Sequence, residues 1–326
     1  MVHQYKNNGY NIVLDVNSGA IHVVDDVTYD VIELFEDNSA KEIIEKLVDR
    51  YPQTEIEEAI QEVNELKDNE ELFTEDTYKE RIKKRQTVVK ALCLHIAHDC
   101  NLACRYCFAE EGEYHGRRAL MSYETGKQAL DFLIANSGSR RNLEVDFFGG
   151  EPLMNWDVVK QLVAYGREQE KLHDKHFRFT LTTNGVLLND EIMEFANKEM
   201  DNVVLSIDGR KEVHDRMRPF RKGAGSYDLI VPKFQKFAES RHQDKYYVRG
   251  TYTHFNTDFS KDVLHLADLG FKQISVEPVV AQPTDEYALK DSDLPVLFDE
   301  YDRLAAEMVK RNKAGNGFNF FHFMID

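Results

Sequence analysis

The residues most able to do chemistry lie between positions 100 and 107, where three of the four cysteines stand in the segment CNLACRYC. Cys100, Cys104 and Cys107 are separated by three and then two residues, so one short loop could bring three thiolates to a single metal centre. A closed tetrahedral zinc site would need a fourth ligand. Three cysteines without an evident fourth favour a [4Fe–4S] cluster with one iron open to another ligand.

Other roles for these cysteines stay open at this point. His95 and His98 lie a few residues upstream and could complete a zinc site. A disulfide within the segment would need an oxidising compartment, whereas cytoplasmic thiols are kept reduced. The fourth cysteine, Cys93, lies inside a predicted strand, and we expect it to be a buried small hydrophobic residue rather than a ligand.

Polar or glycine-rich segments follow three further predicted strands. The glycines of GGEP, residues 149–152, allow a ligand to approach the backbone, and Glu151 offers a carboxylate to a cation or ammonium group. Later strands end in TTNG and SIDG, and Arg218 stands twelve positions beyond Ser206. Each segment alone could be an ordinary turn. Because they recur at the same ends of successive strands, together they indicate a binding site.

The elements that must position these groups form a β/α repeat. From about residue 89, apolar strand-like runs alternate with stretches of helical period, which predicts a parallel sheet covered by helices. Six units can be counted, two fewer than a closed barrel needs. We therefore expect an α/β fold, a partial (β/α)6 barrel over residues 89–314. Its predicted strands lie in ALCLHIA, LEVDFF, FRFTLTT, NVVLSID, YYVRGTYTH and QISVEPVV.

Residues 1–78 follow a different, α+β pattern. The runs YNIVLDV and AIHVVDD flank NSG and predict a β-hairpin, and three helical stretches follow, the last with a capping box from Thr54 and Glu57. The pattern resembles a winged-helix leader-peptide recognition domain of enzymes that modify ribosomally made peptides, which can bind a peptide as an added strand. A packing or dimerisation domain is the alternative. We expect a linker at 79–88 and the start of an otherwise absent C-terminal region at 315–326.

Charge and hydropathy exclude several classes of protein. The formal net charge of −17 over 326 residues argues against nucleic acid as a partner, because such binding depends on Lys and Arg. The sequence has no apolar run of 18 residues, and its start lacks the basic and apolar regions of a secretory signal. We expect a cytoplasmic protein that has no membrane partner.

The motifs together carry a family resemblance. The segment from Cys100 to Cys107 with its aromatic Tyr106, followed in order by GGEP, TTNG and SIDG on a β/α repeat, resembles the radical S-adenosylmethionine (SAM) enzymes. The resemblance covers about residues 89–310. It implies that the three motif cysteines bind a [4Fe–4S] cluster, that SAM chelates the open iron, and that reductive cleavage of SAM yields a 5′-deoxyadenosyl radical that abstracts hydrogen from a substrate.

The resemblance also implies a set of SAM contacts, although it assigns no catalytic acid or base. Tyr106 and Phe108 would lie near the adenine, with Val279 and Val280 as an apolar wall; Gly149, Gly150 and Glu151 would receive the methionine ammonium; Ser206 and Arg218 would hold its carboxylate; Asn184 and Asp208 would contact the ribose or support these groups.

Within that family, the leader-recognition pattern ahead of the cysteine motif looks most like the thioether maturases of six-cysteine (SCIFF) peptides in the radical SAM/SPASM group. This implies a Cys-rich ribosomal precursor peptide, bound through its leader, and a small electron donor such as ferredoxin or flavodoxin. Those maturases carry a cysteine-rich C-terminal SPASM region, whereas no cysteine follows Cys107 here. We therefore expect SAM cleavage by this chain but little thioether product.

Two alternatives remain. One is another radical SAM maturase, similar to the anaerobic sulfatase-maturating enzymes, although these are not expected to need a leader-binding domain. The other is a non-catalytic iron–sulfur protein that binds peptides, although electron carriers generally use four cysteines for each cluster.

Overall fold

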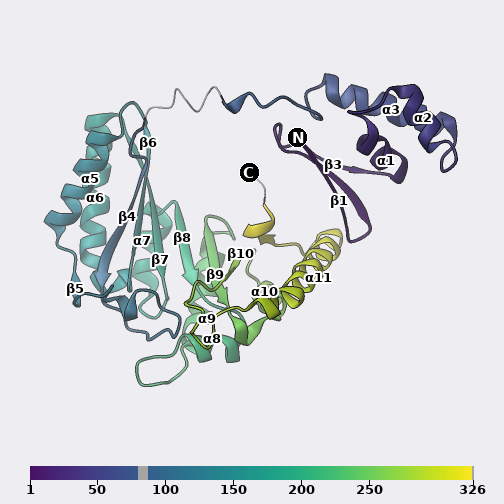
Figure 1. Ribbon diagram of the computed structural model, residues 1–326. Helices are drawn as coiled ribbons and strands as arrows, with labels where there is room; N and C mark the ends of the chain where they lie inside the picture. Colours follow the sequence, from purple (N-terminus) through teal and green to yellow (C-terminus); the bar gives the residue numbers. More distant parts are fainter. Residues whose placement is uncertain (80–86, 325–326) are drawn as a thin grey trace. The chain divides into compact units, whose positions relative to one another are not determined.

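The chain folds into two compact units, Met1–Thr87 and Val88–Asp326. The computed structural model, drawn in Figure 1, describes residues 1–79 and 87–324. Most of the linker expected at 79–88 lies outside these described residues. Within them, no helix is long and apolar enough to cross a membrane.

The small unit is an antiparallel sheet covered by three helices. Its strands β1 (Val2–Asn7), β2 (Tyr10–Asp15) and β3 (Ile21–Val24) lie in the order β1-β2-β3. The predicted hairpin is β2–β3, whereas β1 was not predicted because VHQYKN has only two strongly apolar or aromatic residues among polar ones. The helices α1 (Asp26–Leu34), α2 (Ala40–Leu47) and α3 (Gln53–Asp68) enclose a core that includes Val13, Val31, Ile43, Ile56 and Val63.

Side chains close the first turns of two of these helices. Asp25 accepts a hydrogen bond from the Thr28 backbone at the start of α1, and Ser39 and Glu42 form a capping box on α2. The capping box predicted for α3 is wrong. Pro52 occupies the N-cap and the helix begins at Gln53, so Thr54 already lies inside the first turn.

The large unit is built on an eight-stranded sheet in the order β11-β10-β9-β8-β7-β6-β4-β5. Six long strands run parallel, as predicted: β4 (Ala91–His98), β6 (Asn142–Gly149), β7 (His176–Thr183), β8 (Asn202–Ser206), β9 (Tyr246–Tyr252) and β10 (Gln273–Pro278). Two short strands were not predicted. They are β5 (Ala119–Leu120), antiparallel to β4, and β11 (Asn319–Phe320), parallel to β10. The partial (β/α)6 barrel is therefore confirmed.

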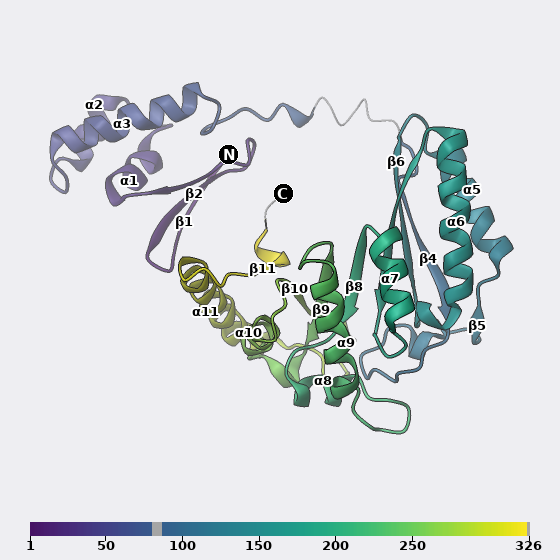
Figure 2. The same cartoon turned by 180° about the vertical axis from the view of Figure 1, so that it is seen from behind.

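Helices connect the strands and cover the outer face of the sheet, and Figure 2 shows the arrangement from behind. Alternate strand residues such as Val145, Phe147 and Phe179 are fully buried against these helices. The residues between them face the inside of the curve and are more polar. The helices are α5 (Tyr123–Asn136), α6 (Trp156–His173), α7 (Asp190–Glu199), α8 (Lys211–Met217), α9 (Tyr227–Ser240), α10 (Ser260–Asp268) and α11 (Leu294–Lys313).

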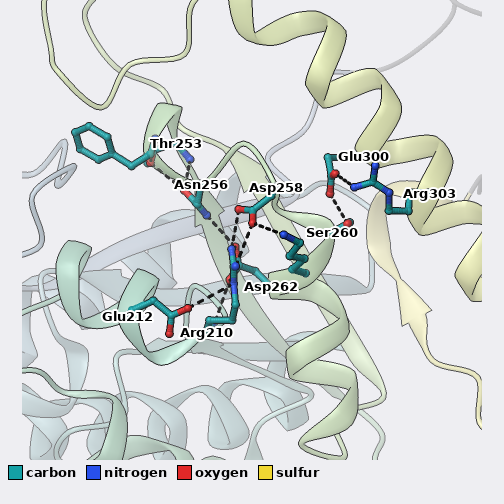
Figure 3. A network of polar contacts seen from close by, with 11 residues as sticks. Arg210, Glu212, Thr253, Asn256, Asp258, Ser260, Asp262, Glu300 and Arg303 are labelled. Carbon is teal, nitrogen blue, oxygen red and sulfur yellow. Dashed lines mark hydrogen bonds and ion pairs between the residues drawn. The ribbon is translucent and has the colours of Figure 1, made fainter.

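A partly buried ion-pair network joins the loop after β8 to the loop after β9 and to α10, as Figure 3 shows. Arg210 donates to Asp258 at 2.7 Å and to the fully buried Asp262 at 2.8 Å. Asn256 also donates to Asp262, at 3.1 Å. Because the planar guanidinium binds two carboxylates at once, the network holds these loops in fixed positions beside the carboxyl ends of the strands.

Candidate functional site

A cavity of about 540 Å³ opens at the carboxyl ends of the parallel strands, where the site was predicted. Cys100, Cys104 and Cys107 line it, and all three are only partly exposed. The structure thus brings the three thiols to one cavity. Nine other predicted site residues line the same cavity: Tyr106, Phe108, Gly149, Gly150, Asn184, Ser206, Arg218, Val279 and Val280.

Backbone hydrogen bonds join the cysteine loop to the end of α8 and the residues that follow it. The backbone N–H groups of Ala103 and Arg105 donate to the carbonyls of Pro219 and Met217, both at 2.9 Å. Arg221 donates to the Cys100 carbonyl at 2.6 Å. The sequence analysis did not single out Arg221, although it lies only three residues beyond Arg218.

The asparagine that directly follows β7 lies beside the first cysteine. The Asn184 amide lies 3.6 Å from the Cys100 sulfur and donates to Asn101 at 2.8 Å. Asn184 is nearly buried and therefore fixed beside the loop. The structure places it against the cysteine loop as well as in the cavity wall.

The glycine turn after β6 packs against the start of the cysteine loop. Gly149 has a φ of 124°, and a Cβ there would lie 2.5 Å from the Ala97 carbonyl oxygen. A Cβ on Gly150 would lie 2.2 Å from the Asp99 carbonyl oxygen. Only glycine fits at both positions, so GGEP serves close backbone packing in addition to lining the cavity.

Glu151 does not line the cavity, contrary to its predicted contact with the methionine ammonium. Its side chain is fully buried and accepts hydrogen bonds from the Leu153 backbone, the Thr183 hydroxyl and the Asn184 backbone at 2.8 to 3.0 Å. Burial raises its pKa to about 7 against the effect of these donors. The carboxyl group ties the turn after β6 to the end of β7.

Asp208 is also turned away from the cavity. It is fully buried, and its oxygens accept from the Tyr106 hydroxyl, the Arg218 Nε and the Thr251 backbone. The Asp208 carboxylate was predicted to contact the ribose or to support other groups. Its oxygens already accept hydrogen bonds from these three protein donors. The structure gives it a supporting position.

The predicted apolar wall lies at the open side of the cavity. Phe108, Val279 and Val280 all line it, yet Phe108 is 69% exposed and Val280 91% exposed. Polar residues of the inner strand faces complete the wall. Those that the sequence analysis did not name are Thr182, Arg249, Thr251 and Glu277.

The alternatives for Cys93, His95 and His98 are not supported by their positions. Cys93 lies in β4 as predicted but is exposed, not buried, and it lines a separate cavity with Asp146. The rings of both histidines contact the Tyr114 ring: His95 is stacked on it with ring centres 4.4 Å apart, and His98 is tilted against it with ring centres 4.9 Å apart. Among the described residues, no three His, Cys, Asp or Glu side chains are placed to hold one metal ion.

Comparisons with known proteins identify the family of this chain. The family model of the Radical SAM superfamily matches residues 94–269, and the chain belongs to this superfamily. Its cofactors are accordingly a [4Fe–4S] cluster and SAM.

Two curated relatives illustrate the range of the family. The radical SAM cyclopropyl synthase TigE of Paramaledivibacter caminithermalis is 23% identical over 265 residues, which cover 72% of this chain and 54% of that protein. The serine-type anaerobic sulfatase-maturating enzyme of Bacteroides thetaiotaomicron is 28% identical over 202 residues, which cover 60% and 46%. The chain spans about half the length of these relatives.

Solved structures share the fold. The structure titled native anSMEcpe with bound AdoMet has a TM-score of 0.61 at 19% identity and covers 72% of this chain and 65% of that one. Streptococcus suis SuiB bound to S-adenosylmethionine has a TM-score of 0.54 at 16% identity, with 98% of this chain and 71% of that one covered.

Proposed function

We propose that this chain cleaves SAM for a radical SAM maturase of a ribosomally made, Cys-rich peptide, and that the bonds formed by that maturase are thioether cross-links from a cysteine sulfur to a carbon. The observation that carries the proposal is the shared cavity of Cys100, Cys104 and Cys107 at the strand ends, on a chain that also has a small α+β unit. With the cluster and SAM bound, reductive cleavage supplies a 5′-deoxyadenosyl radical for hydrogen abstraction.

The protein residues position these groups and exclude water. The three thiolates hold the irons, while Ser206 and Arg218 in the cavity wall are suited to the carboxylate of the methionine part. Gly149 and Gly150 line the cavity, where their backbone groups are open to its ammonium group. We assign no catalytic acid or base.

The small unit supports peptide capture. Its strand β3 pairs with β2 alone among the described residues of the sheet, so its other edge is available to an added strand. Ile21 and Val23 on this strand are 47% and 65% exposed and could contact apolar residues of a leader. A packing or dimerisation surface would use the same edge of the sheet. Binding of the leader peptide itself must therefore be measured to distinguish these roles.

The first experiment measures SAM cleavage. The full chain, reconstituted anaerobically to about four irons, is incubated with SAM and dithionite. Formation of 5′-deoxyadenosine supports the enzyme function. A chain that keeps its irons and makes none would be the non-catalytic iron–sulfur protein.

The second experiment identifies the bond formed in a Cys-rich peptide encoded beside the gene. A thioether removes two hydrogens and one alkylatable thiol, so mass spectrometry with thiol alkylation detects it. A cyclopropane, the product that the name of TigE indicates for that relative, removes two hydrogens and leaves the thiols reactive. Loss of two hydrogens with every thiol still alkylated would overturn the thioether proposal.

The third experiment tests the leader site. Val23→Lys places a charge on the open edge and should weaken leader-peptide binding at least tenfold in fluorescence anisotropy. Val16→Lys is the matched control, because Val16 is 50% exposed and lies outside the strand. Equal effects of both variants would contradict leader binding at β3. A ferredoxin or flavodoxin can then replace dithionite to test the electron donor.

A further inference from the structure

Three residues from distant parts of the chain form a buried cluster beside the second cysteine. Tyr106 lies in the cysteine loop, Asp208 follows β8, and Arg218 follows α8. The Tyr106 hydroxyl donates to Asp208 at 2.6 Å, and the Arg218 Nε donates to Asp208 at 2.9 Å. Arg218 is 13% exposed and Asp208 is fully buried. The ion pair is therefore shielded from solvent. Charges in such a low-dielectric environment act more strongly on their neighbours than charges in water do.

The guanidinium of Arg218 has a defined orientation. Asp208 accepts a hydrogen bond from the Nε of Arg218. The Nη1 and Nη2 groups at the end of the guanidinium therefore remain for other partners. Arg218 and Cys104 line the same cavity, whereas the fully buried Asp208 does not line it. The cation therefore lies at the wall of the cavity that the three cysteines share.

Several contacts hold the anion in place. The Thr251 backbone donates to Asp208 at 3.1 Å, in addition to the Tyr106 and Arg218 donors. His214 lies next to the Asp208 backbone, and burial lowers its pKa to about 4, so it is neutral near pH 7. The Tyr106 hydroxyl donates a hydrogen bond to Asp208, so Asp208 and Arg218 are the charged groups of this cluster.

We propose that the Arg218 cation, which Asp208 holds at the wall of the cysteine cavity, makes the bound cluster easier to reduce, and that the Asp208 anion makes it harder to reduce. One electron passes from an external one-electron donor to the cluster in this step, and no bond or proton moves. A cation beside a thiolate ligand stabilises the form with the extra negative charge, and an anion does the opposite. The proposal rests on the cluster of the proposed function but not on the peptide.

The test is a redox titration of the cluster in the full chain, followed by electron paramagnetic resonance without SAM or peptide. Arg218→Gln removes the cation and leaves Asp208 charged, so the midpoint potential should become more negative. Asp208→Asn removes the anion and should move it to more positive values. The double variant has neither charge, so its midpoint potential should lie between those of the two single variants. Lys236→Gln is the control, since Lys236 pairs with Asp190 on the surface.

A merely structural role predicts a different pattern. Both single variants would then lose iron or unfold without opposite shifts in potential. If Arg218→Gln does not retain its cluster, Asp208→Asn and the double variant still decide the sign. Shifts of the two single variants in the same direction, or potentials equal to that of Lys236→Gln with the cluster intact, would overturn the proposal. Because no peptide is present, failure here leaves the proposed peptide chemistry standing.

Discussion

The hydroxyl of Thr183 donates to the carboxyl group of Glu151 at 2.8 Å, and both side chains are buried. This bond joins GGEP to TTNG, two segments that lie 32 residues apart in the chain. It explains why Glu151 is directed toward β7 instead of the cavity. The motif residues therefore support one another before any of them touches a ligand.

We expect Thr183→Val to destabilise the chain by about 1–2 kcal/mol, because it leaves a buried carboxyl oxygen with one donor fewer. The free energy of unfolding in urea measures the effect. Thr180→Val is the matched control in the same strand, since the Thr180 side chain has no hydrogen-bond partner in the part of the chain that the structure describes. Equal losses for both variants would contradict the role of the Glu151 bond.

Loss of any motif cysteine should remove most of the bound iron, whereas loss of Cys93 should not. Cys100→Ala, Cys104→Ala and Cys107→Ala each delete one ligand at the shared cavity. Cys93→Ala keeps all three and should retain about four irons. Iron and sulfide analysis with visible absorption checks this. A Cys93 variant that loses its iron would place Cys93 among the ligands.

The inner face of the barrel carries a carboxyl group with a raised pKa. Asp146 has one buried oxygen with no hydrogen-bond partner among the described residues, and burial raises its pKa to about 6. Ionisation of Asp146 therefore opposes folding, an effect that is absent below its unfolded pKa of about 4 and complete above about 6.

We expect Asp146→Asn to stabilise the chain by on the order of 1–2 kcal/mol at pH 7.5, because the amide cannot ionise. The gain should fade as the pH falls from about 6 toward 4, where the wild-type carboxyl group is protonated in both states. Urea unfolding at pH 7.5 and pH 5 tests this. A gain that does not shrink at the lower pH would show that ionisation is not its cause.

Gly149→Ala should cost clearly more stability than Gly223→Ala, by at least about 2 kcal/mol. Both glycines have positive φ angles, 124° and 85°. They differ in what a Cβ would meet: the Ala97 carbonyl oxygen at 2.5 Å for Gly149, and nothing within 4 Å for Gly223. Thermal unfolding of the two variants separates the clash from the backbone preference, and similar losses would exclude the clash.

The sequence by itself determined the β/α order and the cavity-lining motifs. Strand and helix period are local properties, so the six parallel strands could be counted. The rule that sites lie at strand ends placed Cys100, Gly149 and Ser206 at one cavity, to which the family resemblance added Arg218. The short strands β5 and β11 have two residues each and carry too little pattern to predict.

Only the tertiary structure decided where individual carboxyl groups point. Glu151 and Asp208 follow strands as predicted, yet neighbouring strands surround them with donors, and a buried carboxyl group must turn toward such partners. The same holds for Cys93, whose burial depends on what faces the inner side of β4. Local spacing fixes which residues reach the end of a strand, whereas contacts between distant segments fix their direction.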